Sequence, residues 1–173
     1  MRLWLGAVTV TLVFVGVYGV SQAGAWRLQS LDRLRIGIRS EINRVRAEHG
    51  LQHLRAARPL RRAAAQHVYE MAVLGYFSHS SPNRTSFAAR VAEYYPSRGY
   101  ATWGVGETLL WWQTPLSARA IVRLWLKSPE HRRQLLDPRF REVGIDAAEI
   151  EGAGGIFGGR TVMLVGADFG VRR

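Results

Sequence analysis

Cysteine is absent from this chain and lysine is nearly so, and each absence narrows the functions that the chain can have. Without cysteine in 173 residues there is no disulfide framework, no thiolate metal site and no cysteine nucleophile. Lys127 is the single lysine among 24 basic residues, which outnumber 13 acidic residues and give a formal charge of +11. Such a charge suits nucleic acid or anionic membranes, but so strong an arginine skew is more typical of a GC-rich genome than of selection for phosphate contacts.

Length and composition predict one folded domain with a short appendage. Hydrophobic residues make up 47% of the chain and aromatic residues 10%, which is enough for a packed core and argues against disorder. Because no disulfide can form, this core must stabilise the fold alone, as a domain of this size can do. The sequence contains no internal repeat and no low-complexity segment.

The first 25 residues differ in kind from the rest and predict export. Between Arg2 and Arg27 the chain carries no charge, and residues 4–20 form an almost unbroken apolar run. Ala23-Gly24-Ala25 follows with the small-x-small pattern of a signal cleavage site. We predict that residues 1–25 are a signal peptide cut after Ala25, or an uncleaved signal anchor that associates with the membrane through residues 4–20. In both cases the body is secreted, or anchored on the outer side of the cytoplasmic membrane.

Apolar periodicity beyond this segment predicts helices first and strands last. Residues 26–37 are interpreted as a linker and the start of the first helix. Helices are expected over residues 28–49, 60–74, 87–94, 115–127 and 129–136, and strands over 142–148 and 160–169, joined by a glycine-rich hairpin. This order favours an α+β fold over a doubly wound parallel sheet.

Three polar residues are candidates for chemistry. His79 lies in a loop after a predicted helix, Glu107 is flanked by glycines, and His131 follows Ser128-Pro129, where the serine can cap a short helix. His67 lies on an apolar helix face and is interpreted as a core residue. The chain has no HExxH, GxSxG or Walker-type GxxxxGK[ST] motif, so spacing alone leaves the function open.

Several short blocks, taken in order, resemble one family. They are Ile42 to Leu51, Phe77-Ser78-His79-Ser80-Ser81-Pro82, Gly106-Glu107, Trp125 to Leu136, Phe140 to Ile145, and Asp168-Phe169-Gly170. Together they resemble a bacterial SCP-like member of the CAP superfamily, which includes cysteine-rich secretory proteins, venom allergens and plant pathogenesis-related proteins. The resemblance covers residues 38–170. It implies a CAP domain, a three-layer α-β-α sandwich with an antiparallel sheet, preceded here by an N-terminal hydrophobic helix.

The resemblance also implies a cleft. In the family two histidines and two acidic residues line it, and in some members the histidine pair binds zinc or another divalent ion. The matching positions are His79, Glu107 and His131, while the fourth, an acid in the family, falls at Ser128. His79 and His131 are therefore the candidate metal ligands and Glu107 the candidate catalytic group. The alternative is a hydrogen-bonded polar cluster that only orders the cleft.

An aromatic cluster adds a second candidate site. Trp103, Trp111 and Trp112 are interpreted as a patch for a lipid or another ligand, the alternative being that the adjacent pair is sheet core on opposite faces. The expected function is binding of a lipid, a glycan or a protein at the cell envelope through the His/Glu cleft, with zinc as the candidate cofactor. A metal-dependent protease or esterase using the same cleft is the alternative. We expect a monomer with no nucleic-acid partner.

Overall fold

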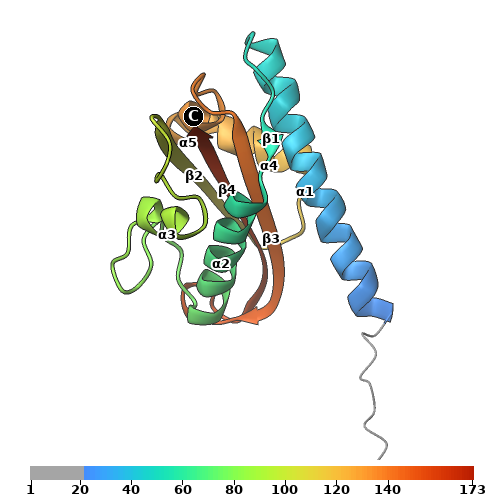
Figure 1. Ribbon diagram of the computed structural model, residues 1–173. Helices are drawn as coiled ribbons and strands as arrows, with labels where there is room; N and C mark the ends of the chain where they lie inside the picture. Colours follow the sequence, from blue (N-terminus) through green and yellow to red (C-terminus); the bar gives the residue numbers. More distant parts are fainter. Residues whose placement is uncertain (1–21) are drawn as a thin grey trace, which may run out of the picture.

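The computed structural model of the chain describes residues 22–173 (Figure 1). Its elements follow one another along the chain as α1 (Gln22–Glu48), β1 (Arg55–Ala56), α2 (Arg58–Leu74), α3 (Phe87–Tyr94), β2 (Trp103–Trp112), α4 (Ala118–Lys127), α5 (Pro129–Leu135), β3 (Glu142–Ala153), the 3-10 helix η1 (Gly155–Phe157) and β4 (Arg160–Arg172). Helices come first and the two longest strands come last, as the sequence predicts for an α+β fold.

The strands form one mixed sheet in the order β1-β3-β4-β2. β4 is antiparallel to both of its neighbours, and Asp168 lies opposite Glu107 of β2 and Gly144 of β3. β1 instead runs parallel to the start of β3 and pairs through only two residues. The expectation of a purely antiparallel sheet is therefore wrong at β1. A two-residue strand is too short to show the alternating pattern by which strands are recognised in a sequence.

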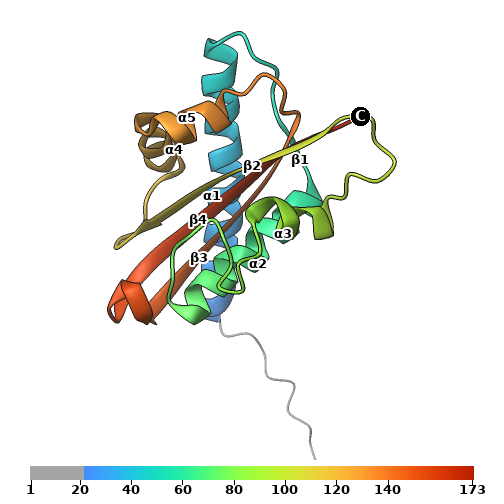
Figure 2. The same ribbon diagram turned by 90° about the vertical axis from the view of Figure 1, so that its left-hand side faces the viewer.

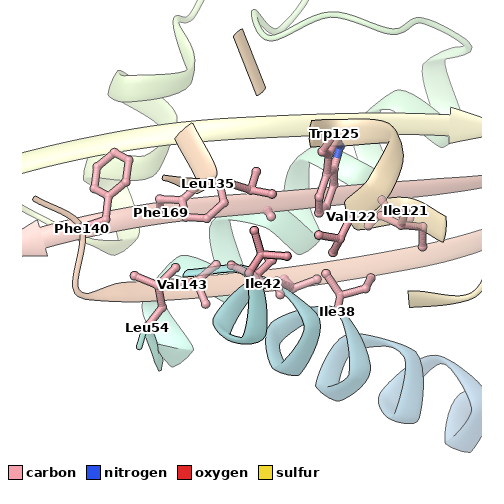
Figure 3. Close-up of a cluster of buried hydrophobic side chains, with 14 of the residues drawn as sticks. Ile38, Ile42, Leu54, Ile121, Val122, Trp125, Leu135, Phe140, Val143 and Phe169 are labelled. Carbon is pink, nitrogen blue, oxygen red and sulfur yellow. The ribbon is translucent and has the colours of Figure 1, made fainter. Parts of the chain in front are cut away.

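Helices cover both faces of this sheet, which gives three layers (Figure 2). α1, α4 and α5 lie on one face, and α2 and α3 on the other. Under α1 and α4, Ile38, Ile42 and Trp125 pack against Val143 and Phe169 of the sheet (Figure 3). Each fully buried side chain of this size stabilises the fold by about 1.5–3 kcal/mol, so core packing can replace the missing disulfides.

On the other face, α2 and the segment after it lie against strand positions that are occupied by glycine, which has no side chain. A Cβ built on Gly144 of β3 would lie 1.9 Å from the backbone nitrogen of Arg61 and 2.1 Å from the carbonyl carbon of Leu60. On β4, a Cβ at Gly166 would lie 3.2 Å from a valine methyl group of α2, and one at Gly170 would lie 2.9 Å from an aromatic ring. The backbone of α2 therefore rests directly on β3.

The outer edge of β3 is only partly covered by another strand. Beyond its two pairs with β1, no strand of residues 22–173 extends the sheet on this side. Asp146 lies on this stretch of β3, with its carboxylate 2.8 Å from Arg35 Nε of α1 and 3.5 Å from Arg61 Nε of α2. Arginines from both helical layers therefore meet on the same strand.

The predicted helix boundaries agree best with the observed ones where a capping residue marks the end of the helix. The predicted helix 87–94 coincides with α3, and Gly75 ends α2 in the left-handed conformation with φ of 66°. The predicted start of the helix 115–127 is wrong, because α4 begins at Ala118. The hydroxyl of Ser117 accepts a hydrogen bond from Ala120 N, and this serine cap outweighs the signal of the proline before it.

The N-terminal region is described only from Gln22 onward, so the apolar run 4–20 and most of the predicted signal 1–25 lie outside the described residues. Residues 26–37 fall within α1, which begins before the start expected from the apolar pattern. Across residues 22–173, no helix has both the length and the apolar character needed to cross a bilayer.

Replacing Gly144 by alanine should strongly destabilise the fold. The added methyl group has no room against α2, so helix and sheet must separate, and overpacking of this kind costs about 1–3 kcal/mol or more. Urea unfolding of Gly144→Ala measures the loss. Gly104→Ala is the matched control, since its Cβ would meet only a valine methyl group at 3.5 Å. Equal stability of both variants would contradict the close packing of α2.

Candidate functional site

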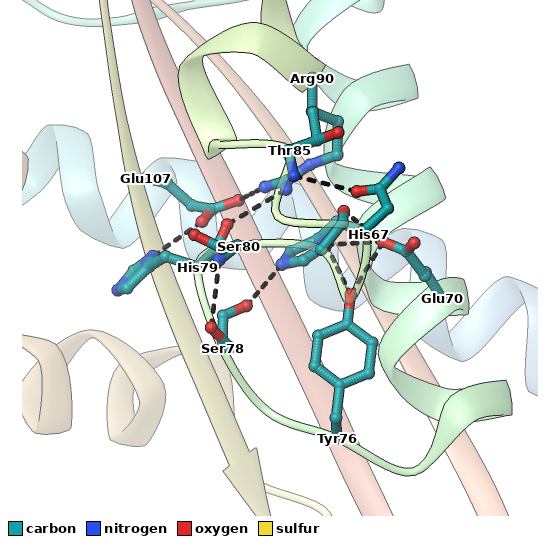
Figure 4. Close-up of polar contacts among 11 residues, drawn as sticks. His67, Glu70, Tyr76, Ser78, His79, Ser80, Thr85, Arg90 and Glu107 are labelled. Atoms are coloured by element: carbon teal, nitrogen blue, oxygen red, sulfur yellow. Dashed lines mark hydrogen bonds and ion pairs between the residues drawn. The ribbon is translucent and has the colours of Figure 1, made fainter.

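A loop, a strand and a helix bring the three predicted polar residues to one pocket. Glu107 lies in the middle of β2 on the side that faces α2 and α3, and only 5% of it is exposed. His79, in the loop after α2, donates a hydrogen bond from Nδ1 to Glu107 Oε1 over 2.7 Å (Figure 4). His131 reaches the same pocket from α5. The pocket has a volume of about 300 Å³ and is lined by His79, Phe87, Glu107, Glu130, His131, Arg133 and Gln134.

The second oxygen of Glu107 is held by a buried arginine. Arg90 of α3 is 2% exposed, and its guanidinium forms an ion pair with Glu107 Oε2. The same guanidinium donates a hydrogen bond to the backbone oxygen of His79 over 3.1 Å. α3 carries Arg90 to this place because the Ser86 hydroxyl caps the helix by accepting from Ala89 N. Arg90 therefore fixes both the carboxylate and the loop that carries the imidazole.

A second carboxyl group lies beside this pair. Asp168 of β4 is paired with Glu107 in the sheet register and is completely buried. Its oxygens have no hydrogen-bond partner among residues 22–173. Burial and then the negative charge of Glu107 raise the pKa of Asp168 well above its usual value, while Arg90 opposes the shift. This shift favours the neutral form of Asp168 beside the ion pair of Glu107 and Arg90.

His131 is positioned by the start of α5. Ser128 caps this helix as predicted, with its hydroxyl 3.5 Å from His131 N, and Pro129 occupies the first turn. Burial, together with the nearby imidazole of His79, lowers the pKa of His131. The neutral form of His131 is therefore favoured, in which one ring nitrogen accepts and the other donates a hydrogen bond. Ser128 itself serves the helix cap and is not among the residues that line the pocket.

A buried network holds the loop that carries His79. His67 Nε2 donates to the Ser78 oxygen over 2.7 Å, while the hydroxyl groups of Tyr76 and Ser81 donate to Glu70 over 2.8 and 2.7 Å (Figure 4). Burial lowers the pKa of His67 and raises that of Tyr76. His67 is thus a core residue whose ring nitrogens both have polar partners, as predicted. Nε2 contacts the Ser78 oxygen in the loop and Nδ1 lies near Glu70 of α2, so the ring connects the loop to the helix.

The donor set does not fit a resident zinc ion. Across residues 22–173, no group of three or more His, Asp or Glu side chains is placed to hold a metal. His79 and Arg90 engage the two oxygens of Glu107, so only the imidazoles of His79 and His131 remain as ligands, beside the positive charge of Arg90. Zinc sites in proteins use three or four protein ligands. For the same reason Glu107 is not available as a free base.

The three tryptophans do not form one patch. Trp103 and Trp111 lie on the α2 side of β2 but at opposite ends of the strand. Trp103 donates to the Tyr95 oxygen over 2.8 Å, and Trp111 meets Phe157 edge to face at 5.4 Å. Trp112 points to the other face and is 44% exposed. The adjacent pair thus divides between the two faces of the sheet, and only Trp112 is exposed.

Arg90 and Asp168 are the site residues that the sequence reasoning missed. Arg90 occupies a buried position of a short amphipathic helix, next to Val91, and a charged residue on an apolar face is a signal of a buried partner. Asp168 likewise interrupts an apolar strand. The sequence contains both irregularities, but only the fold shows that each side chain meets Glu107.

The chain thus combines an α-β-α sandwich with a His/Glu pocket at its edge strand β2. The sequence profile described as the cysteine-rich secretory protein family, CAP, matches residues 39–163. The chain therefore belongs to the CAP family, as its sequence blocks indicated. A search of curated protein sequences gave no significant match.

Solved bacterial structures share the fold. An extracellular protein of Bacillus anthracis with an SCP domain aligns with a TM-score of 0.64 at 22% identity, over 85% of this chain and 43% of its own. An outer surface protein of Borrelia burgdorferi aligns with a TM-score of 0.60 at 20% identity, over 79% of this chain and 90% of its own. A cysteine-rich secretory protein of Staphylococcus aureus aligns with a TM-score of 0.57 at 16% identity, over 82% of this chain and 39% of its own. The chain thus spans less than half of two of these proteins and most of the third.

Breaking the buried ion pair from one side should cost more than removing it from both. Arg90→Met leaves an unpaired buried carboxylate, which typically destabilises by about 3–5 kcal/mol. In Arg90→Met/Glu107→Gln no charge remains, so the loss should be smaller than the sum of the two single losses. A double-mutant cycle from urea unfolding measures the coupling. Strictly additive losses would contradict a direct interaction.

Asp168 should make the protein less stable as the pH rises. Its folded-state pKa is raised, so its contribution to stability is complete below the unfolded pKa of about 3.9 and is lost as the pH rises through the folded value. Asp168→Asn removes this loss, and the stability of the variant relative to the natural chain should increase from pH 4 upward. Asp137→Asn should show the opposite sign and mainly below about pH 4, because the hydrogen bond from Arg139 lowers the pKa of Asp137 and its contribution is lost as the pH falls. Parallel pH profiles would contradict the assignment.

Proposed function

We propose that this chain is an exported CAP-domain protein that binds a saccharide of the cell envelope in the pocket of His79, Glu107 and His131. The observation that carries the proposal is the convergence of these side chains, from three distant segments, on one small pocket. A buried ion pair contributes little net stability compared with a well-packed apolar pair. The buried pair of Arg90 and Glu107 is therefore better explained by what it orients than by what it stabilises.

The chemistry of the lining favours a ligand rich in hydroxyl groups. Glu130 offers acceptors, Arg133 offers donors, and Gln134 and the imidazoles offer both, while Phe87 adds an aromatic ring. Sugar hydroxyls both donate and accept hydrogen bonds, and the apolar face of a sugar ring packs on an aromatic side chain. A volume of about 300 Å³ matches a ring-sized group.

Export is supported by two independent observations. The sequence begins with an apolar run at residues 4–20, followed by a small-residue cleavage pattern. The similar solved structures include an extracellular protein of Bacillus anthracis and an outer surface protein of Borrelia burgdorferi. A saccharide of the bacterial envelope is a ligand that such a location would supply.

A metal and a hydrolytic activity have less support. A divalent ion would find only His79 and His131 as protein ligands, so zinc should bind weakly and without fixed stoichiometry. The alternative function as a metal-dependent protease or esterase needs an ionised base that is free to act. Both oxygens of Glu107 are engaged, by Arg90 and by His79, so Glu107 is not free to serve as that base.

Titration of the full chain with N-acetylglucosamine oligosaccharides tests the proposal. We expect binding by calorimetry, weakened about tenfold or more by His131→Ala, which corresponds to about 1.4 kcal/mol. His131 is the suitable variant because its ring lines the pocket without joining the ion pair of Glu107. Trp112→Ala, on the opposite face of the sheet, is the control and should bind like the natural chain.

Three further titrants distinguish the alternatives. Binding of a soluble peptide or of palmitate, but not of the oligosaccharides, would replace the saccharide by a protein or lipid ligand. Stoichiometric zinc binding that is abolished in His79→Ala/His131→Ala would establish a metal site and reopen the hydrolase alternative. No binding of any titrant would leave the pocket a structural cluster.

A further inference from the structure

Large exposed apolar side chains gather at one end of the molecule. Of the seven large hydrophobic residues exposed in the described part of the chain, five lie on the last turns of α2, in η1 or at the end of β2. They are Tyr69 (70% exposed), Val73 (61%), Leu74 (59%), Ile156 (55%) and Trp112 (44%). We call these five residues the apolar end.

Direct contacts place these segments together. The oxygen of Gly75, which follows α2, accepts a hydrogen bond from Ile156 N over 2.9 Å, so the end of α2 touches the turn between β3 and β4. Trp112 is opposite Met163 near the start of β4, on the side of β2 closest to the same turn. The five side chains thus belong to one end of the sandwich and not to five unrelated places.

The start of α1 lies at this end as well. In two views at right angles, the first turn of α1, the end of α2 and the β3–β4 turn lie at the same end of the molecule (Figures 1 and 2). Gln22 begins α1 and follows the apolar run 4–20 directly in sequence. That run is long enough in sequence for the roughly 17–25 residues of a bilayer span. A segment held in a membrane would therefore bring the apolar end to the membrane surface.

We infer that the apolar end is a membrane-contact surface that rests on the lipid bilayer when residues 4–20 are inserted. Tyrosine and tryptophan favour the boundary between headgroups and acyl chains, and the aliphatic side chains beside them gain by leaving water. Arg160 and Glu151, on the two strands that meet at this turn, carry opposite charges. The inference goes beyond ligand binding, because it states how the domain is oriented at the envelope.

The absence of cysteine makes the orientation directly measurable. Single cysteines introduced as Val73→Cys and Ile156→Cys accept a fluorescent label without any competing thiol. Ser97→Cys, on the loop that leads into the opposite end of β2, is the matched control. The labelled full chains are placed in nanodiscs of zwitterionic phosphatidylcholine. Quenchers fixed at different depths of the lipid chains then report the depth of each label, while a soluble quencher reports exposure to water.

Both test labels should be quenched by lipid-borne groups at a depth of about 5–10 Å below the headgroup boundary, and the Ser97 label should respond only to the soluble quencher. Val73→Asp/Leu74→Asp should return the Ile156 label to water. Ile36→Asp, which alters an exposed apolar residue of α1 away from this end, should not.

Three results would overturn the inference. Equal exposure of all three labels to water would mean that the domain stands off the bilayer. Protection of the test labels from both quenchers would mean that a second copy or another protein covers the apolar end. Failure of the full chain to enter nanodiscs would remove the anchored state that the inference requires. None of these results affects oligosaccharide binding in the pocket, so the two proposals fail separately.

Discussion

The close approach of α2 to the sheet is the constraint on which the rest of the domain depends. Gly144 lets the backbone of Leu60 and Arg61 rest on β3, which fixes the height of the helix. The loop with His79 and then α3 with Arg90 follow α2 directly along the chain. Glu107 belongs to the sheet itself, so the distance between Glu107 and its two partners is set by how α2 sits. The placement of His79 and Arg90 against Glu107 is therefore a consequence of backbone packing.

Electrostatics adds a second condition to this geometry. A carboxylate inside a sandwich is stable only with a partner, and Arg90 supplies it at a position that is itself buried. A second ionised acid beside the pair would upset the balance, and the raised pKa of Asp168 favours its neutral form. At this site one positive charge, on Arg90, then faces one negative charge, on Glu107. Arg90 holds the Glu107 carboxylate, and this carboxylate in turn holds Nδ1 of His79. The orientation of Nε2 on the same ring is fixed as a result.

Local signals in the sequence predicted what local interactions decide. Ser128 and Gly75 marked the start of α5 and the end of α2, because a cap depends only on neighbouring residues. β1 escaped prediction because its pairing with β3 is non-local and only two residues long.

The candidate site could be predicted only in part, for a related reason. The resemblance identified His79, Glu107 and His131, and the fold brings them to one pocket. Arg90 of α3 and Asp168 of β4 could not be assigned a partner from the sequence, because both meet Glu107 only in the tertiary structure. The sequence also grouped three tryptophans by proximity, whereas strand alternation sends Trp111 and Trp112 to opposite faces.

The uncovered edge of β3 bears on how the domain avoids aggregation. A bare strand edge is a template on which another chain can add a strand, and a domain without disulfides opens more readily to such pairing. Asp146, with Arg35 and Arg61 on either side, places charges where an incoming strand would have to lie. Adding a strand would require those charges to lose their water and their partners. The ion pairs that join α1 and α2 to β3 thus also protect the refolded domain against edge-to-edge aggregation.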